Sequence, residues 1–167
     1  MLEEFNKIAA RVAEMLRARG EKIAVTDGAT GGLISASLLT VPGALSFYVG
    51  GGIIYSQRGR DVLFGEYSKA FDEPRSGTEE YTLLQARGIR DNFGAAWGIA
   101  ESGAAGSSKH PRGLASGRSC CAVAGPNGIE ATFVTETESD ERIANMQAFT
   151  RSALELLEKT LAEAAQQ

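Results

Sequence analysis

The spacing of apolar residues predicts a helix at each end of the chain. Apolar residues recur three or four positions apart from Leu2 to Leu16, and Gly20 follows as a stop signal. This is the pattern of an amphipathic helix with a C-terminal glycine. A longer helix is expected from about Asp140. The residues predicted to form its inward face are Ile143, Met146, Ala153, Leu154, Leu157 and Leu161.

Between these two helices, short apolar runs alternate with helical patterns. Three runs predict strands, namely residues 22–26 (KIAVT), 45–56 (LSFYVGGGIIYS) and 95–101 (AAWGIAE). Three segments predict helices, namely residues 33–40, 57–65 and 78–93. The glycines at 50–52 indicate a bulge or a close backbone contact within the second strand. Residues 66–77 are expected to form a loop, and Ser76 with Glu79 a capping box for the third helix.

The last third of the chain predicts a β-hairpin before the final helix. Residues 119–125 and 129–138 flank the sequence PNG, and Asn127-Gly128 is a strong turn signal. Residues 102–118 show no periodicity, and so long a loop is usually functional or mobile. Strands alternating with helices, then a hairpin, predict an α/β fold: a three-layer sandwich whose mixed sheet is covered by helices on both faces. Residues 1–167 are expected to form a single domain, since no repeat or linker is evident.

Charge and composition narrow the classes of partner. The net charge of −4 makes the chain a poor electrostatic partner for nucleic acid. No apolar run approaches the roughly 20 residues of a membrane span, and the acidic, helical N-terminus is unlike a secretory signal. We therefore expect a cytoplasmic protein that binds neither nucleic acid nor membrane.

The cysteines and the histidine do not indicate a metal site or a cofactor. Cys120 and Cys121 are adjacent, so on a strand they would point to opposite faces and serve as small buried residues. His110 is the only histidine, which excludes a zinc site of several histidines. Because it lies in a loop-like stretch before a proline, a solvated surface position is favoured over a general base.

Two glycine-rich turns follow predicted strands, TDGATGG at 26–32 and SGAAGS at 102–107. Ligands of open α/β sheets bind beyond the carboxyl ends of strands, where backbone N–H groups can hold an anion. Neither turn matches a Walker motif or GxGxxG. Taken alone, each turn fits either tight-turn glycines or an anion cradle.

Taken together, the motifs resemble those of the CinA C-terminal domain family (competence/damage-inducible, CinA-like proteins). Those domains read A-E-S-C-T-G-G, then V-P-G-A-S, G-G-x-x-x-Y-S with a lysine soon after, T-G-I-A-G-P, and G-x-R before the last helix. The resemblance runs in order from about Leu2 to Leu161. It implies an α/β sandwich, frequently dimeric, with nicotinamide-nucleotide amidase activity: hydrolysis of nicotinamide mononucleotide to nicotinic acid mononucleotide and ammonia.

The resemblance assigns site residues by position. Those it implies for substrate binding are Asp27, Gly28, Thr30, Gly31, Gly32, Ser102, Gly103, Gly106 and Arg142. Together with residues 50–60, these turns are expected to line one crevice that Arg142 reaches. Asp27 also has a simpler explanation, because it could cap the following helix. Arg142 opposes the dipole of its own helix, and this slight cost leaves a ligand or an acidic partner as one open explanation of its position.

The departures from the family pattern fall at its reactive positions. Gly28 stands where the family has serine, Leu45 stands at the serine of V-P-G-A-S with Ser46 next to it, and Arg60 replaces the lysine. Amide hydrolysis needs a nucleophile, an activator and donors for the oxyanion. A guanidinium stays protonated and cannot act as a lysine base, although it can hold phosphate or carboxylate. We therefore predict a degenerate site with weak or absent activity.

Three functional classes stay open at this stage. A working amidase could use Tyr55, Ser46 or a bound water, with Arg60 as the third catalytic candidate, although Tyr55 could also be a packing aromatic. A regulatory relative could bind a pyridine mononucleotide or another phosphate without catalysis. A structural or interaction protein could keep the pocket only as a remnant.

Overall fold

A computed structural model describes all 167 residues and contains one five-stranded sheet. Its strands are β1 (Ile23–Asp27), β2 (Tyr48–Ile53), β3 (Trp97–Ala104), β4 (Arg118–Ala124) and β5 (Glu130–Glu136), in the spatial order β2-β1-β3-β4-β5. β1 pairs in parallel with β2 and β3, whereas β3–β4 and β4–β5 are antiparallel. The sheet is therefore mixed, as predicted.

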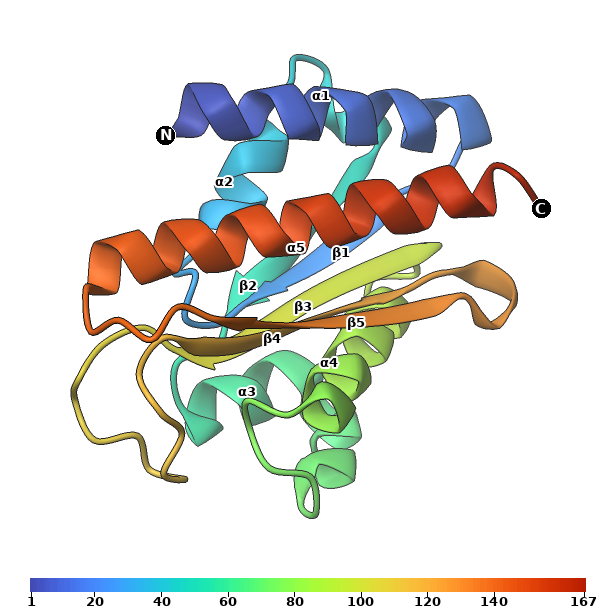
Figure 1. The fold of residues 1–167 in the computed structure, drawn as a ribbon. Helices are drawn as coiled ribbons and strands as arrows, with labels where there is room; N and C mark the ends of the chain where they lie inside the picture. Colours follow the sequence, from blue (N-terminus) through green and yellow to red (C-terminus); the bar gives the residue numbers. More distant parts are fainter.

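Helices cover both faces of this sheet (Figure 1). One face carries α1 (Leu2–Arg19), α2 (Leu33–Leu39) and α5 (Arg142–Ala164), and the other carries α3 (Gln57–Phe64) and α4 (Glu79–Asn92). Short 3-10 helices lie at η1 (Ala44–Ser46), η2 (Gly65–Phe71) and η3 (Pro126–Gly128). The predicted three-layer α/β sandwich is confirmed.

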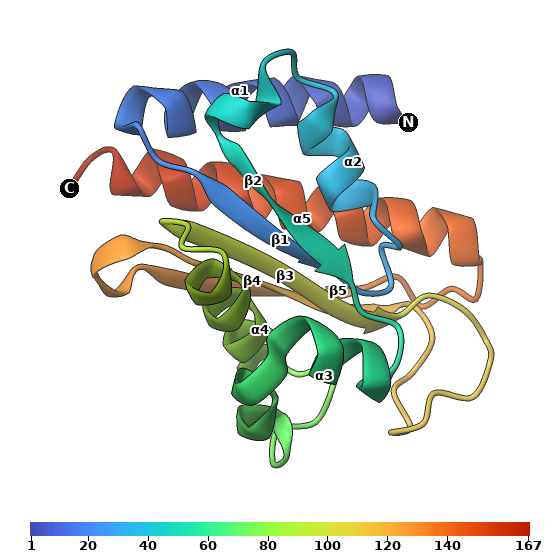
Figure 2. The same cartoon turned by 180° about the vertical axis from the view of Figure 1, so that it is seen from behind.

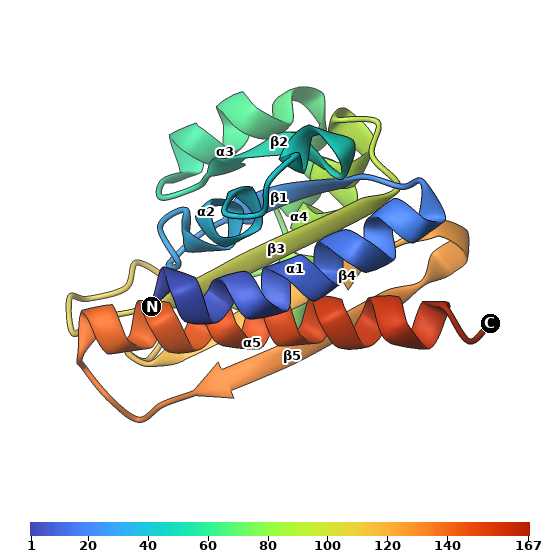
Figure 3. The same cartoon turned by 90° about the horizontal axis from the view of Figure 1, so that it is seen from above.

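The larger hydrophobic core lies between the sheet and the layer formed by α1, α2 and α5. Figure 3 shows α1 and α5 side by side above the strands. Phe5, Leu16, Trp97 and Leu154 are fully buried there. On the opposite face, Phe64, Phe71 and Tyr81 form a smaller aromatic cluster, with ring centroids 4.9 and 5.3 Å apart along that series.

The structure explains two glycine-containing stretches in the way that the sequence predicts, the close backbone contact at Gly51 and the turn at Asn127-Gly128. A Cβ on Gly51 would lie 2.0 Å from the carbonyl oxygen of Val25, so this position of β2 needs glycine for its close approach to β1. The hairpin between β4 and β5 turns through Asn127, whose φ of 56° lies in the left-handed region. Cys120 and Cys121 are unpaired and buried on β4.

Several local predictions are wrong. The cap of α4 is Thr78, whose hydroxyl accepts a hydrogen bond from the Tyr81 N–H, and Glu79 is the first helical residue, so the Ser76–Glu79 box does not form. Ile143 is 72% exposed; the inward position of that turn belongs to Asn145, which donates to the Ala105 carbonyl. The predicted loops are shorter than expected. η2 occupies part of 66–77, and β3 extends to Ala104.

No helix of the structure combines the length and the apolar character needed to cross a bilayer.

Candidate functional site

A cavity of about 620 Å³ lies at the carboxyl ends of β1, β2 and β3. This volume suits a small-molecule ligand. Of the residues predicted for the site, the cavity is lined by Gly28, Tyr55, Arg60, Ser102, Gly103, Gly106 and Arg142. The fold thus brings three separate sequence motifs and the start of α5 to one place.

Ser46 lies apart from this cavity, although it was a catalytic candidate. Its hydroxyl donates to the Gly43 carbonyl at 2.8 Å and accepts from the Arg17 guanidinium at 2.7 Å. The six-residue strand β2 separates Ser46 from Tyr55, and a strand of that length spans about 20 Å. Leu45, its neighbour in η1, is likewise at the far end of the strand. Within one chain, Ser46 therefore cannot act on a ligand in the cavity.

Asp27 is fully buried and holds the β1–α2 turn together. Its carboxylate accepts hydrogen bonds from the N–H groups of Ile34 at 2.9 Å and Ser35 at 3.2 Å. The hydroxyls of Thr30 and Ser35 also donate to it, at 2.7 and 2.8 Å. These partners belong to the turn and the first turn of α2, so the geometry supports the interpretation of Asp27 as a helix cap.

Glu101, which the sequence analysis did not single out, is the main unexpected residue of the site. It is 1% exposed, and its Oε2 accepts from the N–H groups of Gly28 at 3.2 Å and Thr30 at 2.9 Å. The Ser119 hydroxyl donates to its other oxygen. Burial raises the pKa of Glu101, the hydrogen bonds from Ser119 and Thr30 oppose that rise, and nearby Asp27 adds to it.

The TDGATGG turn is therefore closed by the protein's own carboxylates. Glu101 and Asp27 take up N–H groups that could otherwise hold an anion. Gly31 and Gly32 have φ values of 66° and 99°, which glycine adopts without strain. A Cβ on Gly28 would lie 2.4 Å from the Glu101 carbonyl oxygen. For this turn, tight-turn glycines rather than an anion cradle account for the sequence.

In the SGAAGS segment, by contrast with the first turn, backbone N–H groups are not occupied by the protein's own carboxylates. The N–H groups of Ala105, Gly106 and Ser107 donate no hydrogen bond within the protein. The Arg142 guanidinium lies against Gly106, where a Cβ would be 2.8 Å from its Nη2. Arg142 donates to the Ser108 hydroxyl at 3.0 Å and forms no ion pair with a carboxylate. Free N–H groups beside an unpaired guanidinium form a site that suits an anion.

The charged residues of the remaining cavity wall are mostly cationic. Besides Arg142, these cations are Arg60, Lys109 and Arg112, and Glu101 is the only acidic residue of the lining. Arg60 is 7% exposed, bonds Asp61 at 2.9 Å and lies over the Phe71 ring. Burial alone would lower the pKa of Arg60, but its hydrogen bonds to Asp61 and Tyr81 raise it. Arg60 is therefore a permanent cation here and not a base.

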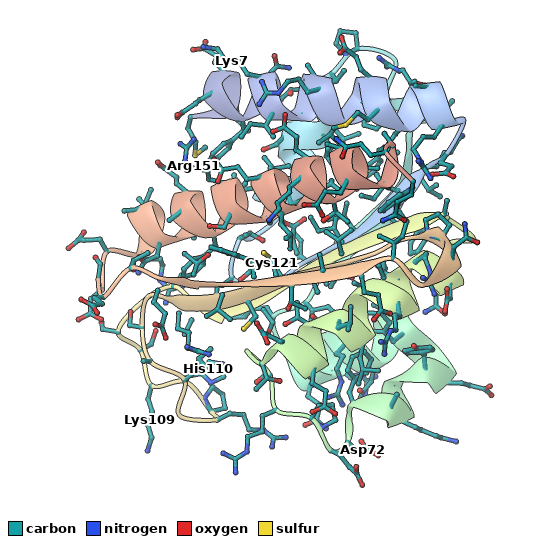
Figure 4. The ribbon with its side chains drawn as sticks, turned by 45° about the vertical axis from the view of Figure 1, so that its right-hand side comes forward. Lys7, Asp72, Lys109, His110, Cys121 and Arg151 are labelled. Carbon is teal, nitrogen blue, oxygen red and sulfur yellow. The ribbon has the colours of Figure 1, made fainter.

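His110 is more enclosed than its sequence context predicts. Its Nδ1 accepts the N–H groups of Arg112 at 3.1 Å and Leu114 at 3.4 Å. Burial lowers the pKa of the imidazole, and the nearby Arg112 lowers it further. In Figure 4, Lys109 extends away from the molecule, whereas His110 turns back toward its body. The expectation of a solvated surface histidine is corrected to a half-buried, neutral one on the cavity wall.

Tyr55 follows β2 at the mouth of the cavity and is 83% exposed. It is therefore not a packing aromatic within this chain, and its ring is open to a ligand or to another surface.

Comparison with known proteins gives a consistent family. A model of the CinA C-terminal domain matches residues 5–161. A CinA-like protein from Prochlorococcus marinus (strain MIT 9313) is 35% identical over 127 residues, which are 76% of this chain and 30% of that protein. One from Desulfosudis oleivorans is 30% identical over 154 residues, which are 92% of this chain and 37% of the relative. The chain spans about a third of the length of these curated relatives.

Solved structures show the same architecture. The competence-damaged protein (CinA) superfamily protein from Klebsiella pneumoniae superposes with a TM-score of 0.84 at 24% identity, covering 95% of this chain and 98% of that one. The competence/damage inducible protein CihA from Agrobacterium tumefaciens gives a TM-score of 0.84 at 20% identity, with coverages of 93% and 94%. At these identities the superpositions establish the α/β fold alone.

Proposed function

Since this chain belongs to the CinA C-terminal domain family, we propose that its cavity binds a pyridine mononucleotide or another small phosphate-bearing ligand, and that it hydrolyses nicotinamide mononucleotide weakly or not at all. The reaction that the family resemblance implies consumes nicotinamide mononucleotide and water and releases nicotinic acid mononucleotide and ammonia. Substrate binding and amide cleavage are the two parts of that activity. Binding is retained, and amide cleavage is reduced or lost.

The proposal of phosphate binding is supported by the segment after β3. The N–H groups of Ala105, Gly106 and Ser107 have no partner within the protein, and the unpaired guanidinium of Arg142 lies against Gly106 in the same segment. A phosphate could accept charge-assisted hydrogen bonds from both, and each such bond contributes about 1.5–3 kcal/mol. The basic wall would attract an anion even though the whole chain carries a net charge of −4.

The observation that carries the proposed loss of hydrolysis is the position of Glu101. Its carboxylate occupies the N–H groups of Gly28 and Thr30, so these two donors are not free to stabilise an oxyanion. Gly28 itself supplies no hydroxyl, and the Glu101 carbonyl leaves no room for one. In this proposal the turn therefore has no nucleophilic hydroxyl and no free N–H group at Gly28 or Thr30 for an oxyanion.

Arg60 and Ser46 also support the proposal that hydrolysis is weak or absent. Arg60 is a cation bonded to Asp61 and cannot take a proton from a nucleophile. Tyr55 is the only hydroxyl-bearing catalytic candidate on the cavity wall, because Ser46 lies at the opposite end of β2. If hydrolysis survives, Tyr55 and a water held by the basic wall are the groups to examine.

Thermal unfolding and ammonia release together test this proposal. A ligand at a hundred times its dissociation constant should stabilise the fold by about 2.7 kcal/mol. We expect nicotinamide mononucleotide, nicotinic acid mononucleotide or inorganic phosphate to raise the melting temperature, with no ammonia released above the buffer rate. If none of these compounds shifts the transition, the alternative of a structural or interaction protein with a residual pocket is favoured instead.

A further inference from the structure

Two buried side chains have a polar atom without a hydrogen-bond partner. These atoms are the hydroxyl oxygen of Thr26 and the amide oxygen Oε1 of Gln85. Thr26 is fully buried, and Gln85 is 2% exposed. Because an unpaired polar group is costly to bury, such an atom in a native protein needs an explanation. One explanation is that its partner belongs to a ligand.

Both residues lie between the sheet and α4. Ala24 on β1 packs in the aromatic cluster beside α3 and α4, and side chains two positions apart on a strand share a face, so Thr26 points to the same side. Gln85 follows Tyr81 by one turn of α4, and both line the cavity. In Figure 2, α3 and α4 lie together below the strands. The α4 wall of the cavity thus carries a glutamine whose amide oxygen is unpaired.

The two walls of the cavity offer a ligand different chemistry. On the α5 side, the unpaired guanidinium of Arg142 lies against Gly106 and suits a phosphate. On the α4 side, the Nε and Nη2 of Arg60 both donate to Oδ1 of Asp61, at 3.0 and 2.9 Å, so a carboxylate already compensates this cation. Gln85 is uncharged. The α4 wall therefore suits a neutral polar group better than a second anion.

We propose that Gln85 is a specificity-determining residue of the cavity, and that it selects a mononucleotide whose pyridine ring carries a neutral carboxamide over one that carries a carboxylate. A glutamine side chain offers one acceptor oxygen and one NH2 donor, and a primary carboxamide offers the same pair. The two amides can therefore hydrogen-bond in both directions. A half-turn of the terminal amide exchanges its oxygen and nitrogen, so either atom can face the ligand. This inference rests on the proposed binding of a pyridine mononucleotide.

A carboxylate at the same place binds less well for a chemical reason. It has no N–H or O–H group to donate, so the Oε1 of Gln85 stays unpaired or faces another acceptor. Lys109 and Arg112, the other cations of the α4 side, are exposed, and salt screens their attraction to a carboxylate. Gln85 thus favours the carboxamide, the group that amide hydrolysis would remove, over the acid that it would produce.

Isothermal titration with nicotinamide mononucleotide and nicotinic acid mononucleotide tests this inference, because the two ligands differ only in the carboxamide and the carboxylate. For the wild type we expect the carboxamide ligand to bind at least about tenfold more tightly. Gln85→Met keeps an unbranched side chain without the amide, and should bring the two affinities close together. Gln147→Met makes the same exchange on α5, outside the cavity, and should keep the wild-type preference.

A second variant separates hydrogen bonding from packing. Gln85→Glu keeps an acceptor for the ligand's NH2 group, and its charge repels a carboxylate, so it should retain the preference for the carboxamide. If Gln85→Met and Gln85→Glu both lose the preference, the effect belongs to packing and the inference fails. Retention of the full preference by Gln85→Met would overturn it as well.

The stability of the ligand-free protein distinguishes a binding role from a purely structural one. Gln85→Met removes an unpaired buried amide oxygen, so its melting temperature should equal or exceed that of the wild type. A lowered melting temperature with an unchanged preference would show that Gln85 serves the fold, for example through a buried water shared with Thr26, and would overturn the inference. Equal wild-type affinities for the two nucleotides would overturn the inference alone, whereas binding of neither would overturn the proposed function with it.

Discussion

Glu101 and Asp27 are two buried carboxyl groups that serve the same turn from different directions. Asp27 binds the N–H groups at the start of α2, and Glu101 reaches across from β3 to the N–H groups of Gly28 and Thr30. Buried carboxyl groups are costly unless such donors satisfy them. The turn is therefore fixed by internal acids.

The raised pKa of Glu101 predicts a pH-dependent stability. The folded protein holds this proton at pH values where the unfolded chain has released it, so Glu101 lowers stability progressively as pH rises from the ordinary value of 4.5 through the raised one. Glu101→Gln can accept from the Gly28 and Thr30 N–H groups with its amide oxygen and donate to the Ser119 hydroxyl with its NH2 group, without the charge. We expect the stability of this variant relative to wild type to increase from pH 4 to pH 8 in urea unfolding. Glu14→Gln, at an exposed site on α1, is the control, and parallel profiles for Glu101→Gln and wild type would contradict the prediction.

Gly28→Ser should not restore hydrolysis. The new Cβ would lie 2.4 Å from the Glu101 carbonyl oxygen, which is backbone and cannot move aside freely. We expect a loss of about 1–3 kcal/mol in unfolding free energy, as for other overpacked sites, and no ammonia from nicotinamide mononucleotide. Gly59→Ala is the matched control, because its Cβ would meet only the Ser56 hydroxyl at 3.5 Å. Turnover by Gly28→Ser would show that the donors held by Glu101 can be released.

At the scale of elements, the first turn of α5 and the end of β3 form the side of the cavity where we propose that a ligand binds. Arg142 is the first residue of α5, where its charge opposes the helix dipole, and no carboxylate compensates it. Instead, its guanidinium lies against Gly106 and bonds Ser108. An anionic ligand would offset the unfavourable position of this charge.

Arg142→Gln should therefore weaken phosphate binding while leaving the fold intact. Loss of one charge-assisted hydrogen bond of about 1.5–3 kcal/mol corresponds to a roughly 10- to 100-fold weaker affinity. Isothermal titration with nicotinic acid mononucleotide or phosphate measures this change. Arg151→Gln removes the same charge from the same helix, at a site paired with Glu4, and should bind like wild type. Equal affinities for all three proteins would remove Arg142 from the site.

The helices could be predicted from sequence where the apolar residues at helical spacing are also the residues that pack in the core. Leu16 and Leu154 follow helical spacing and are fully buried in the core. The pattern failed at Ile143, because the first turn of α5 packs its Asn145 on the Ala105 carbonyl rather than an apolar residue on the sheet. It failed at Ser76 because a cap depends on where the helix begins, and Thr78 two residues later fits that place.

Residues of the site could be predicted from sequence only where they belong to a motif of neighbouring residues. Gly28, the SGAAGS segment, Tyr55, Arg60 and Arg142 were identified from sequence, and the fold gathers them around one cavity, whereas Gly31 and Gly32 do not line it. Glu101 could not be found in that way, because its partners lie 73 and 71 positions away and come close only when β3 pairs with β1. His110 likewise depends on hydrogen bonds that only the folded loop provides.

At the scale of the whole molecule, the scaffold and the chemistry of the site are separate features. The α/β sandwich is that of the CinA C-terminal domain family, and we propose that the cavity at the ends of its strands binds a ligand. In this proposal amide cleavage is weak or absent because Gly28 offers no hydroxyl, Glu101 occupies two N–H donors and Arg60 is bonded to Asp61. The central claim is binding without turnover.

Proton NMR of nicotinamide mononucleotide mixed with the purified protein tests that claim most directly, because one spectrum reports both binding and conversion. We predict that the pyridine resonances broaden or shift in proportion to protein concentration, as expected for exchange with a bound state, and that no resonances of nicotinic acid mononucleotide appear over many hours. Accumulation of product beyond one equivalent of protein would contradict the loss of hydrolysis. Spectra that are unchanged at every protein concentration would contradict binding.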